Sequence, residues 1–216
     1  MLIYAIFAHP DDCELWAGGT LWKHVKIGDI VKTFIFYDIT EQRKSESITS
    51  LDTLGIECSF CQTEPFMTPN IYSFLNKRIE VPDIIITHWN YDSHIEHKSI
   101  FNLAIELIHY WNRNKIRNNN GTYPILLMGS TYFLLGENKM FQPNIIIDIT
   151  TEFKDKINAI KFHKSQKVDL LISDVRSQNI LFGNSIQREF AEGFLEYPTF
   201  GRFFSANREN LKELIK

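Results

Sequence analysis

The chain has 216 residues, of which 44% are hydrophobic and 23% are charged, and its formal net charge is -3. A chain of this length can bury a large core without disulfides, so we expect a single domain over residues 1–216. The slightly acidic charge argues against nucleic acid or an anionic membrane surface as the main partner. No stretch approaches the roughly 18 apolar residues of a membrane span. The N-terminus lacks the features of a secretory signal and the three cysteines form no even set, so we expect a cytoplasmic protein.

Apolar runs of strand length alternate with stretches of helical spacing along the chain. The runs predicted to be strands are 2–8, 30–37, 56–60, 84–87, 125–128 and 145–149. The stretches predicted to be helices are 14–27, 41–54, 71–79, 97–111, 151–163 and 210–216. The pattern between residues 164 and 209 does not assign its elements. The alternation predicts an α/β protein with a mainly parallel sheet and helices on both faces.

Ligands of such folds bind beyond the carboxyl ends of the strands. Three predicted loops occupy this position, at 9–14, 38–43 and 88–97. The first reads HPDDCE and the third reads HWNYDSHIEH. Both are therefore rich in side chains that bind metals or transfer protons.

These two loops can supply a catalytic zinc site. Such a site typically takes three His or carboxylate ligands and leaves one position open to water. His9 and Asp12 from the first loop and His97 from the other can form that set. A set of two histidines and one aspartate also accepts other divalent metals, such as Fe2+.

The remaining polar residues fit the other roles of amide hydrolysis, which needs a base for water, an acid for the leaving amine and donors for the oxyanion. Asp11 is the candidate base. His94 is the candidate oxyanion donor, and Asp92 or another carboxylate can orient its ring. Taken alone, the first loop can instead be a turn and a helix cap, and the histidines can be polar loop residues. Their joint presence at strand ends favours the chemical interpretation.

The two loops also resemble a known family. The run His9-Pro10-Asp11-Asp12-Cys13-Glu14 followed by Gly18-Gly19-Thr20 resembles the HPDDxE…GGT motif of the PIG-L/LmbE-like zinc deacetylases. Residues 88–97 resemble the second motif of that family, HxxxDxHPDH. The similarity continues to the segment Ala191-Glu192-Gly193-Phe194, which resembles the AEGF motif.

The resemblance implies a Rossmann-like three-layer sandwich that binds zinc through three ligands: His9, Asp12 and His97. It implies that Asp11 is the general base and then the acid, that His94 stabilises the oxyanion, and that Arg43 helps to hold the substrate. Family substrates are mostly N-acetylated amino sugars, free or conjugated. We therefore expect a zinc-dependent N-deacetylase with a small-molecule amino-sugar substrate.

The sequence departs from the family pattern in ways that leave alternatives open. Ile95-Glu96 replaces the usual Pro-Asp of the second motif, and the loops 38–43 and 62–70 differ from their common forms. A related amidase that acts on a formyl or other acyl group, or on a non-sugar amine, would share every catalytic residue. A catalytically silent sugar- or metal-binding relative is a further alternative. A nucleotide-binding module is disfavoured, because the sequence lacks the glycine fingerprint of such modules.

Several other features are expected to be structural. Cys58 and Cys61 would point to opposite faces of a strand, and Gly18-Gly19 would let a helix pack close to the sheet. The helical patterns place three further histidines at surface or partly buried positions: His24, His109 and His163. An aromatic group near the C-terminus is expected in the core or in a subunit interface of a homo-oligomer: Tyr197, Phe200, Phe203 and Phe204.

Overall fold

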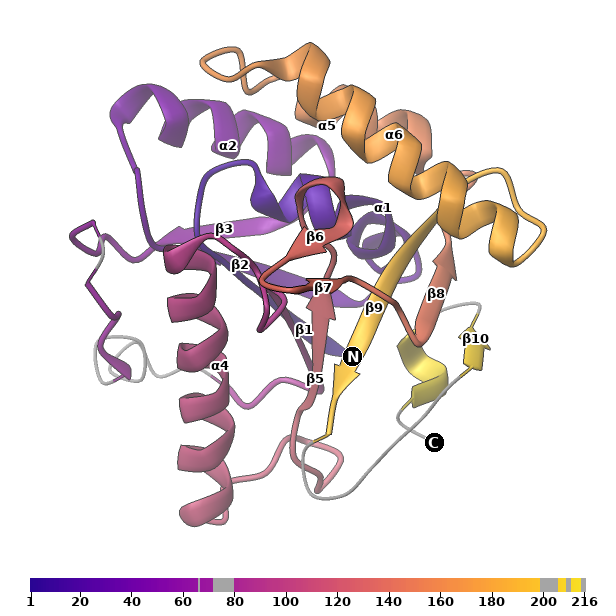
Figure 1. Ribbon diagram of the computed structural model, residues 1–216. Helices are drawn as coiled ribbons and strands as arrows, with labels where there is room; N and C mark the ends of the chain where they lie inside the picture. Colours follow the sequence, from indigo (N-terminus) through magenta and orange to yellow (C-terminus); the bar gives the residue numbers. More distant parts are fainter. Residues whose placement is uncertain (66, 72–79, 199–205, 209–210, 215–216) are drawn as a thin grey trace.

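The computed structural model describes every residue except 66, 72–79, 199–205, 209–210 and 215–216. The described residues form an eight-stranded sheet with the strand order β10-β8-β9-β5-β4-β1-β2-β3 (Figure 1). Its strands are β1 Leu2–Phe7, β2 Ile30–Ile35, β3 Glu57–Phe60, β4 Ile84–Thr87, β5 Ile125–Gly129, β8 Ile145–Asp148, β9 Ala191–Tyr197 and β10 Ala206–Arg208. A small hairpin pairs β6 Leu135–Gly136 with β7 Lys139–Met140.

The helices connect these strands. They are α1 Asp12–Lys26, α2 Glu41–Thr53, α4 Ile95–Arg113, α5 Phe153–Ile160 and α6 Val168–Ser185, with the short 3-10 helices η1 Tyr132–Leu134 and η2 Leu211–Leu214. Within the described residues, no helix is both long and apolar enough to cross a bilayer.

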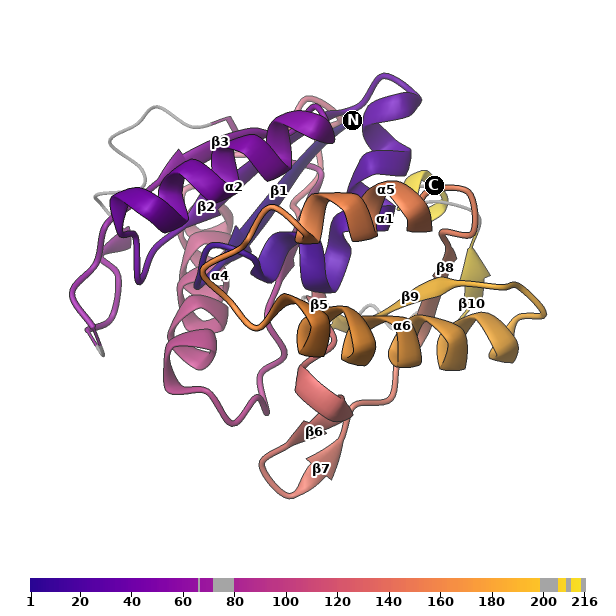
Figure 2. The same cartoon turned by 90° about the horizontal axis from the view of Figure 1, so that it is seen from above.

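The central strands are continuous apolar runs because both faces of the sheet are covered. Along β1, Ile3, Ala5 and Phe7 point into one core cluster, while Tyr4 and Ile6 point into another. The first cluster contains buried side chains of α1, α2 and α5, and the second contains those of α4. Figure 2 shows α1, α2 and α5 together, with α4 across the strands from them. The α/β fold with helices on both faces is confirmed.

Most of the sheet is parallel, but β9 is not. It lies between β5 and β8 and runs antiparallel to both of them, pairing Leu127 with Glu196 and Ile147 with Glu192. Although they are charged, the side chains of Glu192 and Glu196 are buried. This arrangement brings a late segment of the chain into the middle of the sheet.

The predicted strands are all present, and the predicted helices differ mainly at their ends. Helices α1 and α4 begin at Asp12 and Ile95, two residues earlier than expected, so that Asp12 and His97 lie in first helical turns. The helix expected at 71–79 falls almost wholly on residues outside the described part of the chain, as do the side chains of Phe200, Phe203 and Phe204. The described part of the helix expected at 210–216 is the 3-10 turn η2.

Two of the expectations for structural residues hold and one does not. Cys58 and Cys61 are free and pack against different core clusters, and a Cβ on Gly19 would lie 2.7 Å from the Ile149 side chain. The prediction for the histidines is wrong for two of them: His24 and His163 are fully buried. They can be buried because carboxylates accompany them, Asp29 at 2.8 Å and Glu14 at 2.9 Å.

Candidate active site

The loop after β1 carries two acidic residues into helix α1. Asp11 has a φ of 121°, a left-handed conformation that residues other than glycine rarely adopt. Its side chain makes no capping hydrogen bond, and the Asp12 carboxylate accepts the backbone N–H of His9 at 2.7 Å. Neither carboxylate therefore acts as a helix cap. Backbone strain of this kind is typical of functional loops.

Three donor atoms from two distant segments converge beside this loop. The Nδ1 atom of His9 lies 3.3 Å from Oδ2 of Asp12 and 3.3 Å from Nε2 of His97. The third distance, between Nε2 of His97 and Oδ2 of Asp12, is 3.6 Å. A tetrahedral zinc ion with bonds of about 2.0–2.1 Å spaces its ligand atoms about 3.3–3.4 Å apart. The donor triangle of these three atoms can thus hold such an ion.

Asp92 holds the ring of His97. Its Oδ2 atom lies 2.8 Å from Nδ1 of His97 and accepts the hydroxyl of Thr131 at 2.6 Å. Its Oδ1 atom accepts the backbone N–H of His94 at 2.8 Å. Burial opposes the ionisation of Asp92, but the hydrogen bond from His97 holds its pKa low, at about 2. The expectation that Asp92 orients the His94 ring needs correction, because both of its oxygens are engaged elsewhere.

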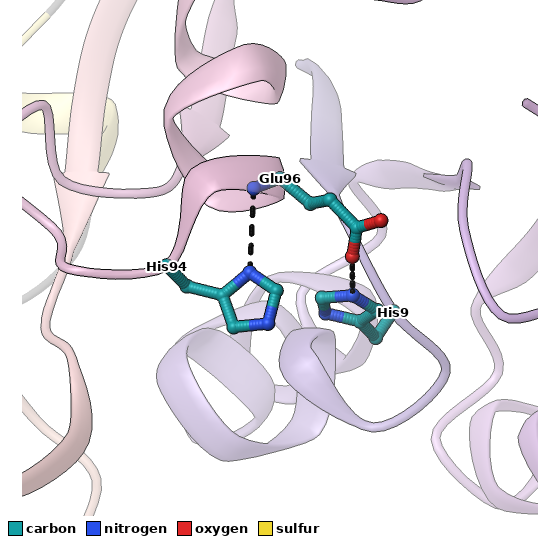
Figure 3. Close-up of side chains that lie close together, drawn as sticks. All are labelled: His9, His94 and Glu96. Carbon is teal, nitrogen blue, oxygen red and sulfur yellow. Dashed lines mark hydrogen bonds and ion pairs between the residues drawn. The ribbon is translucent and has the colours of Figure 1, made fainter. Parts of the chain in front are cut away.

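Glu96 holds the ring of His9 in the same way. Its Oε2 atom lies 2.7 Å from Nε2 of His9, as Figure 3 shows. Carboxylates commonly bind the second nitrogen of metal-binding histidines and thereby fix the ring and its tautomer. In both His9 and His97, one nitrogen is engaged with a carboxylate, and the other belongs to the donor triangle.

His94 lies at the start of α4 and has a different environment. Its Nδ1 atom accepts the backbone N–H of Glu96 at 3.3 Å (Figure 3), so the neutral ring carries its proton on Nε2. Burial and the neighbouring His97 and His9 lower its pKa. The His94 ring stacks on His97 with centroids 4.6 Å apart. A neutral His94 can therefore donate a hydrogen bond from Nε2 next to the donor triangle.

Asp11 is buried next to Arg43. The Nη2 atom of Arg43 lies 3.3 Å from Oδ2 of Asp11 and donates to the Pro10 carbonyl at 2.6 Å. Its Nη1 atom contacts Asp38. Burial and the charge of Asp12 raise the pKa of Asp11 to about 7, and the Arg43 guanidinium opposes this rise. Asp11 is thus tuned toward the range in which a carboxylate works as a base near neutral pH.

The comparisons with known proteins agree with this geometry. The model of the PIG-L family, described as GlcNAc-PI de-N-acetylase, matches residues 4–108, which contain the whole donor triangle, Asp11 and His94. Residues 4–108 are therefore similar to the PIG-L family.

Relatives extend the similarity beyond the residues that match the PIG-L model. A diacetylchitobiose deacetylase from Thermococcus kodakarensis is 24% identical over 91% of this chain and 83% of its own length. The N,N'-diacetylchitobiose deacetylase from Pyrococcus horikoshii has the same fold, with a TM-score of 0.72 at 22% identity over 91% of this chain and 84% of that one. The 4-carboxy-2-hydroxymuconate hydratase of Pseudomonas putida KT2440 is equally similar in fold, with a TM-score of 0.77 at 15% identity over 94% and 99% of the two chains.

A pocket of about 390 Å³ opens above the donor triangle. Every predicted site residue lines it except Asp12 and Asp92, which lie beneath. Asp38 and Pro65 add one residue each from the loops 38–43 and 62–70, and Gln166 closes another side. The volume suits a small organic substrate.

Two further rings of the site, His88 and Tyr132, have no role assigned from the sequence. His88 is fully buried and stacks on His97 at 3.8 Å, and burial together with His97 lowers its pKa to about 4. Tyr132 lines the pocket. Burial and the carboxylates of Asp12 and Asp11 raise the pKa of Tyr132, so its phenol stays protonated. Tyr132 follows the carboxyl end of β5, so the strand-end rule that selected the other loops could have found it.

Proposed function

We propose that this protein is a zinc-dependent hydrolase that removes an N-acetyl group from an amino sugar or a sugar conjugate. The observation that carries the proposal is the convergence of His9, Asp12 and His97 at tetrahedral spacing beside the buried Asp11. The names of two relatives, both diacetylchitobiose deacetylases, support the acetylated sugar as the substrate class. The similar fold of a hydratase means that the fold alone does not choose the reaction.

In this proposal His9, Asp12 and His97 hold the metal. When bound, zinc would lower the pKa of a water molecule and polarise the acyl carbonyl. Asp92 and Glu96 keep the rings of His97 and His9 in the tautomers that leave a lone pair for the ion. Other divalent metals, such as Fe2+, suit the same set of ligands.

The chain's own residues account for the proton transfers. Asp11 takes a proton from water, whose oxygen forms a bond to the carbonyl carbon. His94 donates a hydrogen bond from Nε2 to the carbonyl oxygen as it becomes negative. Asp11 then gives its proton to the amine nitrogen as the C–N bond breaks. The products are acetate and the free amine.

Arg43 contributes to both chemistry and binding in this scheme. Its contact with Asp11 keeps the base partly ionised, and its position in the pocket wall allows it to meet a hydroxyl or carbonyl of the sugar. We also place the protein in the reducing cytoplasm, with which the free thiols of Cys13, Cys58 and Cys61 agree.

The test is the release of acetate and free amine from a panel of N-acetylated amino sugars, free and nucleotide-linked, by metal-loaded protein. Release that a chelator abolishes and added zinc restores supports the proposal. A panel of N-formyl and longer N-acyl sugars and of non-sugar amides separates the alternative amidase from the deacetylase. No release from any of these substrates by metal-loaded protein would contradict the proposal and favour a silent binding protein.

A further inference from the structure

Tyr132 lies in the wall of the pocket and contacts the rings of His97 and Trp16. Its ring centroid is 6.4 Å from that of His97, with the planes 26° apart, and 4.9 Å from that of Trp16, which meets it edge-on. Trp16 in turn donates from Nε1 to Oδ1 of Asp12 at 3.3 Å. The ring of Tyr132 is thus fixed against one metal-ligand candidate directly and against another through Trp16.

Among the described residues, no hydrogen bond engages the phenolic hydroxyl of Tyr132, and the residue lines the pocket. Other polar groups of the site are engaged: Arg43 with Asp11, Glu96 with His9, and Asp92 with His97 and Thr131. A neutral phenol is a good donor. The hydroxyl of Tyr132 is therefore available to donate to a substrate in this pocket.

The backbone around Tyr132 is strained and firmly held. Phe133 and Leu134 have φ values of 52° and 58°, a left-handed conformation that is unfavourable for residues other than glycine. Helix α6 fixes the turn: Asp174 accepts the N–H of Phe133 at 3.2 Å, and Gln178 donates to the carbonyl of Thr131 at 2.9 Å. Strain that neighbouring elements hold in place is typical of active sites, where it positions a reacting side chain.

The turn is also connected to the candidate metal ligands. Thr131 donates its hydroxyl to the same Asp92 oxygen that holds His97. Two adjacent residues therefore contact the site from different sides: Thr131 binds Asp92 behind His97, and Tyr132 lies in the pocket wall.

We infer that Tyr132 is a catalytic residue, which donates its phenolic hydrogen bond to the acyl oxygen of the substrate as that oxygen becomes negative, alongside Nε2 of His94. The inference rests on the proposed function. It assigns the oxyanion two side-chain donors that follow the neighbouring strands β4 and β5, one from the start of α4 and one from η1. A donor of this kind contributes mainly to kcat, because the oxygen is charged only in the transition state.

The test is the variant Tyr132→Phe, which removes the hydroxyl and keeps the ring. We expect kcat for acetate release to fall by about 10²-fold, the typical effect of removing one oxyanion donor, with little change in KM. Metal content and Tm stay as in the wild type. The matched control is Tyr91→Phe, since Tyr91 is 38% exposed and lies outside the pocket lining; its kcat stays unchanged.

A second measurement separates catalysis from structure. A phosphonamidate analogue of the N-acetyl sugar carries charged oxygens where the tetrahedral intermediate does. Tyr132→Phe should weaken its inhibition by about the factor by which kcat/KM falls, and leave the affinity for the amine product unchanged.

The outcomes are distinct. Full kcat in Tyr132→Phe, a rise in KM alone, or a loss of metal or of Tm would overturn the role of Tyr132 while the wild type remains an active deacetylase. A metal-loaded wild type that releases no amine would contradict the proposed function and, with it, this inference.

Discussion

Helix α1 contacts two groups of buried ionisable residues that differ in one respect. The active-site group comprises the donor triangle, Asp11 and Arg43, at the N-terminal end of the helix. The second group, here called the sealed cluster, comprises Glu14, Lys156, His163 and Glu192. All members of the sealed cluster are at most 1% exposed. Both groups contain carboxylates beside bases, so composition does not distinguish them.

The difference lies in what the polar atoms face. In the sealed cluster, Glu192 accepts hydrogen bonds from Lys156 at 2.6 Å and from the backbone N–H groups of Gly19 and Thr20 at 2.9 and 2.8 Å. In the active-site group, three lone pairs point toward one another and toward a pocket. The Lys156–Glu192 pair and its backbone donors satisfy one another and stabilise the fold, whereas lone pairs that converge without a proton between them bind a ligand.

The largest expected effect is on the donor triangle. His97→Ala should abolish metal binding and reduce acetate release to the level of chelator-treated wild type, because two ligands hold zinc poorly in a site built for three. Metal analysis of the purified variant checks this. Full activity in His97→Ala would remove His97 from the ligand set.

Asp11→Asn should separate metal binding from catalysis. The variant keeps the metal but loses about 10²–10⁴-fold in kcat, because an amide cannot take the proton of water. Metal content and turnover are measured on the same sample. Metal-free Asp11→Asn protein would show that Asp11 is a ligand rather than the base.

The sealed cluster should respond in stability rather than in chemistry. Glu192→Gln leaves the Lys156 ammonium buried without a counter-charge, and breaking such a pair costs about 3–5 kcal/mol of the free energy of unfolding. Lys156→Met should cost less, because Glu192 keeps its two backbone donors. Chemical denaturation of both variants and of the double variant measures the coupling. A loss of kcat per metal-loaded molecule without a loss of stability would contradict the comparison.

The smallest effect concerns the pH dependence. The Arg43 guanidinium lowers the pKa of Asp11, so Arg43→Met should let that pKa rise. Since the base must be ionised, the acid limb of kcat/KM moves to higher pH, by about one unit. Arg43→Lys, which keeps the charge, is the control with a smaller shift. An acid limb that moves to lower pH would show that a different group is titrating.

The N-terminal part of the fold could be predicted from the sequence because its strands are uninterrupted apolar runs, such as Ile84–Thr87. The elements between residues 164 and 209 could not be predicted in this way. Strand β9 carries the buried Glu192 and Glu196, and α6 buries Gln178 and Asn179, so neither shows a plain apolar period. Two of these residues have partners far along the chain, Glu192 with Lys156 and Gln178 with the Thr131 carbonyl, and such partners are invisible in the local pattern.

The same limit applies to the site. The donor residues lie within two short loops at predicted strand ends, so their convergence could be expected from the fold class. The residue that Asp92 binds could not be predicted. It depends on the rotation of the first turn of α4, which places His97 rather than the His94 ring against the Asp92 carboxylate. Thr131 joins the site only because β5 lies next to β4 in the sheet.

The position of Glu192 has a consequence for how the protein is made. Glu192 lies 173 residues after Gly19, whose N–H it accepts. The strand of Glu192, β9, lies between β5 and β8 and pairs with both. Contacts so distant along the chain form late in folding. On the ribosome, all three metal-ligand candidates emerge long before β9 does. A nascent chain halted before residue 191 has therefore made its complete set of ligands while α1, which carries Asp12, still lacks the strand that anchors it.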